Sequence, residues 1–167
     1  MIFVIVGTHE QQFNRLVEYM DKWAEKHKEE VIIQTGFSIY EPKFAKWQKL
    51  FPYKEMDALV KKARIVITHG GPSSFIAPLK IGKIPIVVPR RKEFGEHVND
   101  HQLIFCREVA ERQKNIIEIE DVEYLGLVIR DYENIIKKCN NASKSNNDTF
   151  CQMFEEIVDS LFQENKL

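Results

Sequence analysis

Short apolar runs alternate with segments of helical periodicity along most of this chain. Nearly continuous hydrophobic runs occupy residues 2–6, 31–35, 64–68, 84–89 and 115–119, and a further strand is expected within 44–51. Such runs are typical of parallel strands that helices cover on both faces. Between them, apolar residues at helical spacing predict helices at about 13–28, 56–63, 73–81, 98–112 and 122–139. The alternation predicts an α/β fold with a doubly wound, Rossmann-like parallel sheet.

The last part of the chain has a different pattern. A polar stretch without periodicity, 140–148, predicts a linker after a domain at 1–139, and 149–167 predicts a C-terminal amphipathic helix. One face of that helix collects the apolar residues Phe150, Met153, Phe154, Ile157, Val158, Leu161 and Phe162. This face either packs against the chain's own sheet or docks into a groove on a partner.

Composition narrows the classes of function. The 167 residues suit one domain with a real core, and 24 basic against 25 acidic residues give no bulk electrostatic reason to expect nucleic-acid binding. The three widely spaced cysteines fit neither a disulfide framework nor a zinc pattern. Every apolar run is too short for a signal peptide or a membrane span, so we expect a cytoplasmic protein that reaches a membrane only through a partner.

Two loops follow predicted strands at the edge where open α/β sheets bind ligands. The first contains Gly7 and Thr8, and the second contains His69, Gly70, Gly71, Pro72, Ser73 and Ser74. Glycine lets backbone approach a ligand closely, and the start of the following helix favours an anion such as a diphosphate. We expect Ser73 and Ser74 to cap this helix and to offer hydroxyls. Neither loop has the dinucleotide or Walker pattern, which disfavours nicotinamide cofactors and ATP hydrolysis, and a tight turn into a helix is the alternative interpretation.

Cations and then hydrogen-bonding side chains follow the strand at 84–89. Arg90, Arg91 and Lys92 could face a phosphate, an acidic partner surface or solvent. Beyond them stand Glu96, His97, Asn99, Asp100, His101 and Gln102. Sugar hydroxyls both donate and accept hydrogen bonds, which such side chains match. A metal site from His97, Asp100 and His101 is disfavoured because no fixed ligand spacing is present.

In this order, the motifs HGG, GKIP and NDHQ resemble the glycosyltransferase family 28 C-terminal domain, the nucleotide-sugar-binding half of GT-B glycosyltransferases. The segments VGTHEQQFNRL, HGGPSSF, GKIPIVVPR and GEHVNDHQ are most similar to one branch of that family. This branch is the small subunit of two-chain bacterial capsule and exopolysaccharide glycosyltransferases. The resemblance covers roughly residues 1–112.

The resemblance implies roles for particular residues. Gly7 and Thr8 would lie near the donor phosphates, 69–74 would form the diphosphate loop, and His101 and Gln102 would contact sugar hydroxyls. Many relatives hold the ribose with a glutamate where this chain has Ala77, so either Glu96 takes over this role or the chain is less selective for its nucleotide.

The implied reaction is an inverting transfer of a hexose from a UDP-sugar to a polyprenyl-diphosphate-linked saccharide. Galactose is the first choice of sugar and N-acetylglucosamine the second, with no metal or other cofactor required. A single domain of this type implies a membrane-associated, acceptor-binding partner subunit at the inner face of the membrane, which the helix at 149–167 would contact.

His9 is the candidate general base on this chain, because it follows a strand end and the pKa of histidine suits proton transfer. Its alternatives are a capping or interface role, with the base on the partner. The chain could also be a non-catalytic subunit that binds a UDP-sugar and enhances a partner glycosyltransferase. A sugar-nucleotide epimerase and a receiver or flavin domain are disfavoured.

Overall fold

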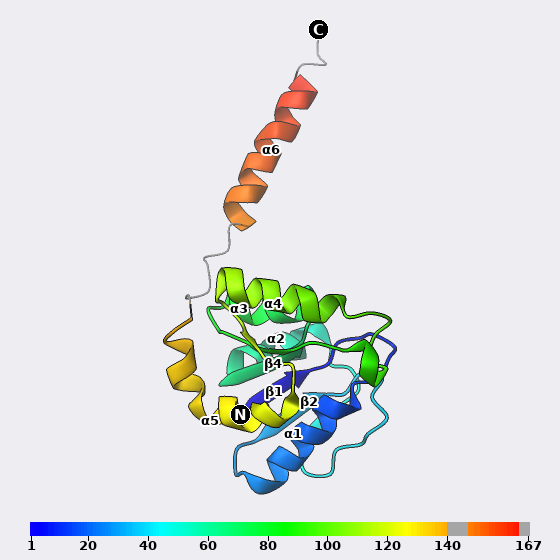
Figure 1. The fold of residues 1–167 in the computed structure, drawn as a ribbon. Coiled ribbons are helices and arrows are strands. Elements are labelled where there is room, and N and C mark those ends of the chain that lie inside the picture. The colour runs from blue at the N-terminus through cyan, green and yellow to red at the C-terminus, as the bar shows by residue number, and fades with distance from the viewer. Residues whose placement is uncertain (140–146, 164–167) are drawn as a thin grey trace.

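A computed structural model describes residues 1–139 and 147–163 of the chain. It confirms the doubly wound α/β fold, with six parallel strands in the order β3-β2-β1-β4-β5-β6 (Figure 1). The strands are β1 Ile2–Ile5, β2 Val31–Gln34, β3 Lys46–Gln48, β4 Ile65–His69, β5 Ile86–Val88 and β6 Ile117–Glu118. The helices are α1 Asn14–Lys26, α2 Tyr53–Lys62, α3 Pro72–Lys80, α4 His101–Gln113, α5 Leu125–Ile136 and α6 Asn147–Gln163, with 3-10 turns η1 Lys92–Phe94 and η2 Val122–Tyr124.

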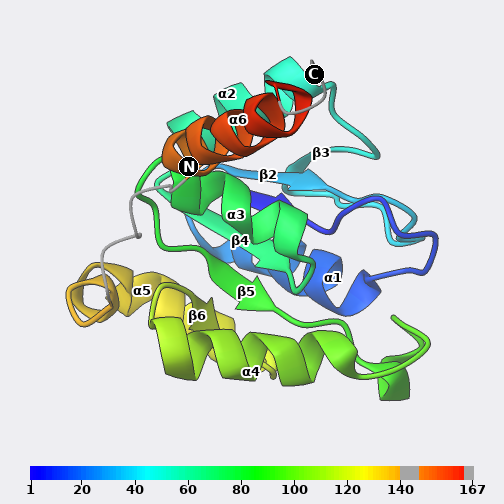
Figure 2. The same cartoon turned by 90° about the horizontal axis from the view of Figure 1, so that it is seen from above.

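Helices cover both faces of the sheet, which explains why its central strands are hydrophobic throughout. Ile2, Val4 and Ile67 pack with residues of α1 and α5 on one face, whereas Phe3 and Val66 pack with residues of α2 on the other. Seen from above, the strands run from β3, beside α2, to β6, beside α4 (Figure 2). The sheet therefore forms the middle of three layers.

Several helices begin at other residues than the periodicity predicts. The helix α4 begins at His101 instead of 98, and residues 95–100 form turns and bends. In this segment Asp100 accepts a hydrogen bond from the Lys92 backbone and Asn99 accepts one from the His101 backbone. Such side-chain hydrogen bonds compete with a helical turn. The helix α2 begins three residues before the predicted 56, and the start of the predicted helix at 122–139 tightens into η2.

The order of the strands reverses its direction between β1 and β4. The loop after β1 and the loop after β4 therefore lie side by side at the carboxyl ends of the two central strands. In doubly wound sheets, ligands bind in the crevice at this switch point. Both glycine-containing loops of the sequence belong to it.

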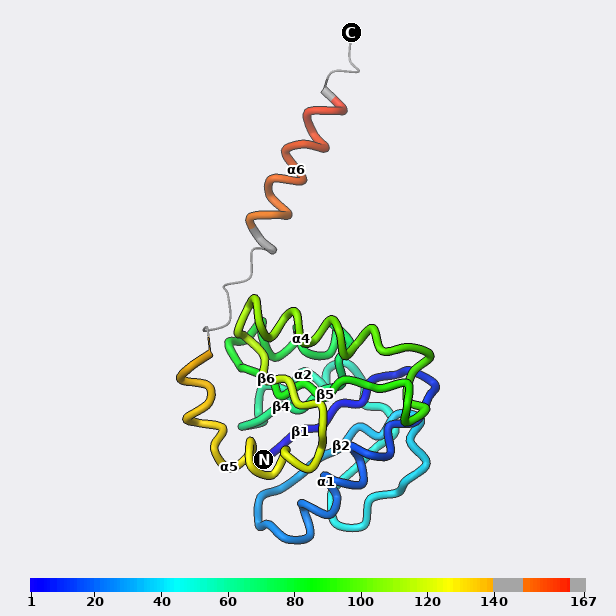
Figure 3. Tube along the Cα trace, in the orientation of Figure 1, coloured from blue at the N-terminus to red at the C-terminus, as the bar shows by residue number. Residues whose placement is uncertain are grey.

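The C-terminal helix does not pack against the sheet. α6 begins two residues before the predicted 149, and it is drawn apart from the three layers in Figures 1 and 3. Its apolar residues Phe150, Met153, Phe154, Ile157, Leu161 and Phe162 are between 56% and 71% exposed. The interpretation that this face packs on the chain's own sheet is therefore wrong. Most of the predicted linker, 140–146, and the last four residues lie outside the described residues.

None of the described helices combines the length and the apolar character that crossing a bilayer requires.

Candidate functional site

The imidazole of His69 lies at the centre of the switch point. His69 is the last residue of β4 and only 8% exposed. Its Nδ1 accepts a hydrogen bond from the Gly71 backbone at 3.0 Å, so Nε2 carries the proton and lies 2.8 Å from the Ser74 hydroxyl. Burial, and then the positive charge of Arg90, lowers the pKa of His69 to about 4. The ring is therefore neutral near pH 7 and holds the two turns in place.

The glycines beside His69 are required by its ring. A Cβ atom at Gly71 would lie 2.2 Å from His69 Cε1, and one at Gly7 would lie 2.4 Å from His69 Nε2. Gly7 also has a φ of +82°, which L side chains rarely adopt. Glycine at these positions lets the loops after β1 and β4 close on the same ring. The motif HGG therefore assembles the two loops before any ligand binds.

A cavity of about 470 Å³ opens beside these loops. Its polar edge is formed by Gly7, Thr8, His69, Ser73 and Ser74. Its apolar wall includes Leu50, Phe51, Met56, Val60 and Ile81, and Tyr53, 85% exposed, also lines it. Such a cavity suits a ligand that has an apolar or flat part at one end and hydrogen-bonding groups at the other.

The first turn of α3 faces this cavity without a side-chain cap. Gly71 is the N-cap residue and Pro72 is the first helical residue, so the expectation that Ser73 or Ser74 caps the helix is wrong. Both serines lie inside the first turn, where the Ser74 hydroxyl contacts His69 and Ser73 is exposed in the cavity lining. The partial positive charge at the N-terminus of α3 is therefore directed at the cavity edge, where it favours an anion.

Three histidines form a row next to the switch point: His9 in the loop after β1, His97 in the loop after β5, and His101 at the start of α4. The ring centroids of His9 and His97 are 4.9 Å apart, and those of His97 and His101 are 4.5 Å apart. The sequence placed His97 and His101 near one another, and the fold adds His9 from the loop after β1. His97 is half-buried, and its burial together with the neighbouring His101 and His9 lowers its pKa.

The hydrogen bonds of this row decide which nitrogen can accept a proton. His9 Nδ1 accepts from the Gln11 backbone at 3.2 Å, so in the neutral ring the proton is on Nε2, which is then a donor. His101 Nδ1 lies 2.5 Å from Asn99 Oδ1, which also accepts from the His101 backbone. Because an amide oxygen only accepts, His101 Nδ1 carries the proton and Nε2 keeps its lone pair. On this chain, His101 is therefore better arranged than His9 to act as a base.

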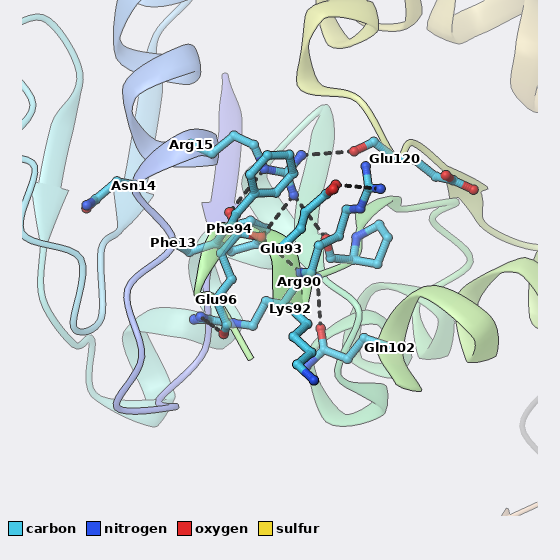
Figure 4. Close-up of polar contacts among 12 residues, drawn as sticks. Phe13, Asn14, Arg15, Arg90, Lys92, Glu93, Phe94, Glu96, Gln102 and Glu120 are labelled. Carbon is cyan, nitrogen blue, oxygen red and sulfur yellow. Dashed lines mark hydrogen bonds and ion pairs between the residues drawn. The ribbon is translucent and has the colours of Figure 1, made fainter. Parts of the chain in front are cut away.

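Arg90 is part of the interior, where it lies among Phe13, Glu96 and Gln102 (Figure 4). Its side chain is 0% exposed and donates to the carbonyl oxygens of Val6 at 2.8 Å and of Gln11 and Gln12 at 2.9 Å. Its guanidinium carbon lies 4.9 Å from the centre of the Phe13 ring. Burial lowers the pKa of Arg90 to about 10, which leaves it charged at neutral pH. The expectation that Arg90 contacts a donor phosphate is wrong for this arrangement, because both terminal nitrogens of the guanidinium donate to backbone carbonyls.

Glu96 and Gln102 are buried in the same network. Glu96 is 0% exposed, and its carboxylate accepts two hydrogen bonds from Arg15, each 3.0 Å long, and one from the Arg91 backbone. Gln102, 5% exposed, accepts from the Arg90 backbone through Oε1. Neither the ribose role expected for Glu96 nor the sugar contact expected for Gln102 fits these positions. Instead, the network ties the loop after β1 to the loop after β5.

Asn99 and Asp100, which the sequence also predicts as ligand contacts, instead make hydrogen bonds within and next to the 97–102 segment. Asn99 is exposed and orients His101, while the Asp100 carboxylate accepts from the Lys92 backbone at 2.8 Å. Within 1–139 and 147–163, no group of three His, Cys, Asp or Glu residues is arranged to hold a metal ion.

Three residues that matter to the site were missed from the sequence. Arg15 pairs with Glu96, and Gln34 and Asp57 line the cavity. Gln34 had a readable signal, since it places an amide at the end of an otherwise apolar strand. Arg15 and Asp57 lie on helices among other charged residues, and only their neighbours in space distinguish them.

Comparison with known proteins gives one family. The Glycosyltransferase family 28 C-terminal domain matches residues 1–159, which is most of the chain. No curated protein matches the sequence.

If the His69 ring excludes a side chain at position 71, Gly71→Ala should destabilise the protein only while the ring is present. We expect Gly71→Ala to lower the free energy of unfolding by about 1–3 kcal/mol, the usual cost of overpacking. In a His69→Ala background the same substitution should cost much less, and urea denaturation of the four proteins measures the coupling. Equal costs in both backgrounds would contradict the packing role.

Replacing Arg90 by Met keeps most of the side-chain volume but removes the donor from four backbone carbonyl oxygens, those of Val6, Gln11, Gln12 and Glu96. We expect the free energy of unfolding to fall by about 3 kcal/mol or more, measured by urea denaturation. Arg91→Met is the matched control, because Arg91 pairs with the exposed Glu93 and should contribute less than about 1 kcal/mol. If the Arg90→Met protein is fully stable but binds a nucleotide more weakly, the result would instead indicate that Arg90 contacts the ligand.

Proposed function

The chain belongs to the Glycosyltransferase family 28 C-terminal domain family, and we propose that it is the donor-binding and catalytic subunit of a two-component inverting glycosyltransferase. In this proposal it transfers a hexose from a UDP-sugar to a polyprenyl-diphosphate-linked saccharide during capsule or exopolysaccharide synthesis. We favour galactose over N-acetylglucosamine because the motifs of this chain resemble those of the small subunits of two-chain capsule and exopolysaccharide glycosyltransferases. The observation that carries the proposal is the cavity at the switch point, whose polar edge combines the α3 N-terminus with both glycine loops.

The proposal includes a position for each part of the UDP-sugar. The nucleoside would lie in the apolar part of the cavity, and the diphosphate would lie at the N-terminal end of α3 beside Ser73. Thr8 lines the cavity and His9 is the next residue, so the loop after β1 leads from the cavity to the histidine row. A sugar that extends from the diphosphate along this loop would reach His9, His97 and His101.

In the reaction, an acceptor hydroxyl attacks the anomeric carbon while the bond from that carbon to the UDP oxygen breaks. The electron pair leaves with UDP, whose increased negative charge the α3 N-terminus stabilises. The hydroxyl proton goes to a general base. His101 Nε2 is the candidate on this chain, since Asn99 fixes the proton on the other nitrogen.

The exposed apolar face of α6 supports the second half of the proposal. Six large apolar side chains lie exposed on one helix, which is unusual for a free surface and typical of a helix that docks into an apolar groove. We propose that this groove belongs to the membrane-associated subunit that binds the lipid-linked acceptor.

Catalysis is tested with the chain co-expressed with its acceptor-binding subunit, by following transfer of radiolabelled galactose from UDP-galactose to the lipid acceptor. His101→Ala should reduce kcat/KM by roughly 100-fold or more, the usual effect of losing a general base. Glu111→Ala, an exposed position on the same helix, should leave the rate unchanged. If the partner alone transfers galactose slowly and this chain only raises that rate, the result would support the alternative, in which this chain is a non-catalytic UDP-sugar-binding subunit.

Partner docking is tested separately by co-purification. Deleting 146–167, or introducing Phe154→Glu, should abolish recovery of the partner, because the change removes the apolar face or places a charge in it. Glu156→Gln on the polar side of the helix should retain it. Unchanged recovery with the deletion variant would show that another surface makes the contact.

A further inference from the structure

Gln34 places an unpartnered amide at the wall of the cavity. It is the last residue of β2, is only 3% exposed, and lines the cavity beside Ile5. Within the described part of the chain, its Oε1 atom has no hydrogen-bond partner. A buried polar atom without a partner costs free energy, so such atoms are rare unless a ligand or water completes them. The amide can also rotate to present either a donor or an acceptor.

The strand register adds a second unpartnered group to the same row. Ile5 of β1 lies between Gln34 of β2 and Thr68 of β4. The Thr68 hydroxyl is fully buried and likewise has no hydrogen-bond partner among the described residues. Thr68 does not line the cavity, so of these two groups only the Gln34 amide can meet a ligand there.

Asp57 is the only charged side chain among the described residues that line the cavity. It lies on α2, and its Oδ2 accepts a hydrogen bond of 2.6 Å from Lys61 one turn later. A carboxylate has two oxygens, so Oδ1 stays available for a hydroxyl of a ligand. Ala77 lines the cavity from α3 and offers only a methyl group. A negative charge here repels phosphate and attracts hydroxyl donors.

These positions divide the cavity between the parts of a nucleotide. The α3 N-terminus attracts phosphate, whereas a carboxylate typically binds the hydroxyls of a ribose in doubly wound nucleotide sites. We propose that Asp57 binds the ribose hydroxyls and that Gln34 hydrogen-bonds the edge of the base, so that this cavity selects a ribonucleotide donor. The inference rests on the proposed function, because it assumes that the ligand of the cavity is a nucleotide-sugar.

The role of Asp57 is tested by calorimetric titration of the full chain with UDP and with 2′-deoxy-UDP. The wild-type chain should bind UDP roughly 10-fold more tightly, the effect of one hydrogen bond to a charged acceptor. In Asp57→Ala this preference should fall to about one. Lys61→Ala is the matched control, since it breaks the same ion pair but keeps the carboxylate, and it should retain the preference.

The outcomes separate the two proposals. If Asp57→Ala binds UDP and still prefers it to 2′-deoxy-UDP as the wild-type chain does, the ribose role is overturned and the proposed function stands. The same holds if Lys61→Ala loses this preference as completely as Asp57→Ala does. If the wild-type chain binds neither nucleotide, the proposed function and this inference are both overturned.

The role of Gln34 is tested by Gln34→Met, which replaces the amide by a side chain of similar size. A group reserved for a ligand contributes nothing to the folded chain alone, so the melting temperature should not fall. Affinity for UDP should decrease roughly 10-fold while affinity for pyrophosphate, which has no base, stays the same. A lower melting temperature with unchanged UDP affinity would overturn the assignment.

Discussion

The position of the His69 ring is the constraint on which the candidate site depends. The ring fills the space that side chains would occupy at Gly7 and Gly71, and it hydrogen-bonds the Gly71 backbone and Ser74. It therefore joins the loops after β1 and β4 and sets where α3 begins. Because it is neutral, it leaves the partial positive charge at the α3 N-terminus as the local attraction for an anion. A protonated ring would have to be buried as a charge, which the interior disfavours.

A second, charged framework supports the other side of the site. Arg90 holds the carbonyl oxygens of the loop after β1, and Arg15 holds the Glu96 carboxylate beneath the 97–102 segment. Burying charges is costly, and the many hydrogen bonds of this network offset that cost. Its result is to bring His9 close to His97 and His101, although they are about ninety residues apart in the chain. The histidine row is thus a product of scaffold residues that do not themselves face a ligand.

The two frameworks give the two sides of the site different chemical characters. On one side of the glycine loops is a cavity with apolar walls, an unpartnered amide and one carboxylate. On the other is a row of three imidazoles, in which Nδ1 of His9 accepts a hydrogen bond and Nδ1 of His101 donates one. A nucleotide-sugar has the same order of chemistry, from base and ribose through diphosphate to sugar. The exposed apolar face of α6 lies on a separate element, which contributes no residue to the cavity lining.

The sequence by itself determined the fold, and it predicted that both glycine loops lie at one edge of the sheet. Short hydrophobic runs that alternate with segments of helical periodicity are typical of buried parallel strands, and the carboxyl ends of such strands meet at one edge of the sheet. It did not determine which polar side chains face that edge. Arg90, Glu96 and Gln102 have the composition of ligand contacts but turn inward, whereas Gln34 and Asp57 come from elements that carry no motif. The direction of a side chain depends on the carbonyls, rings and carboxylates that other segments bring next to it. Those neighbours exist only in the tertiary structure, and so does the exposure of the α6 apolar face.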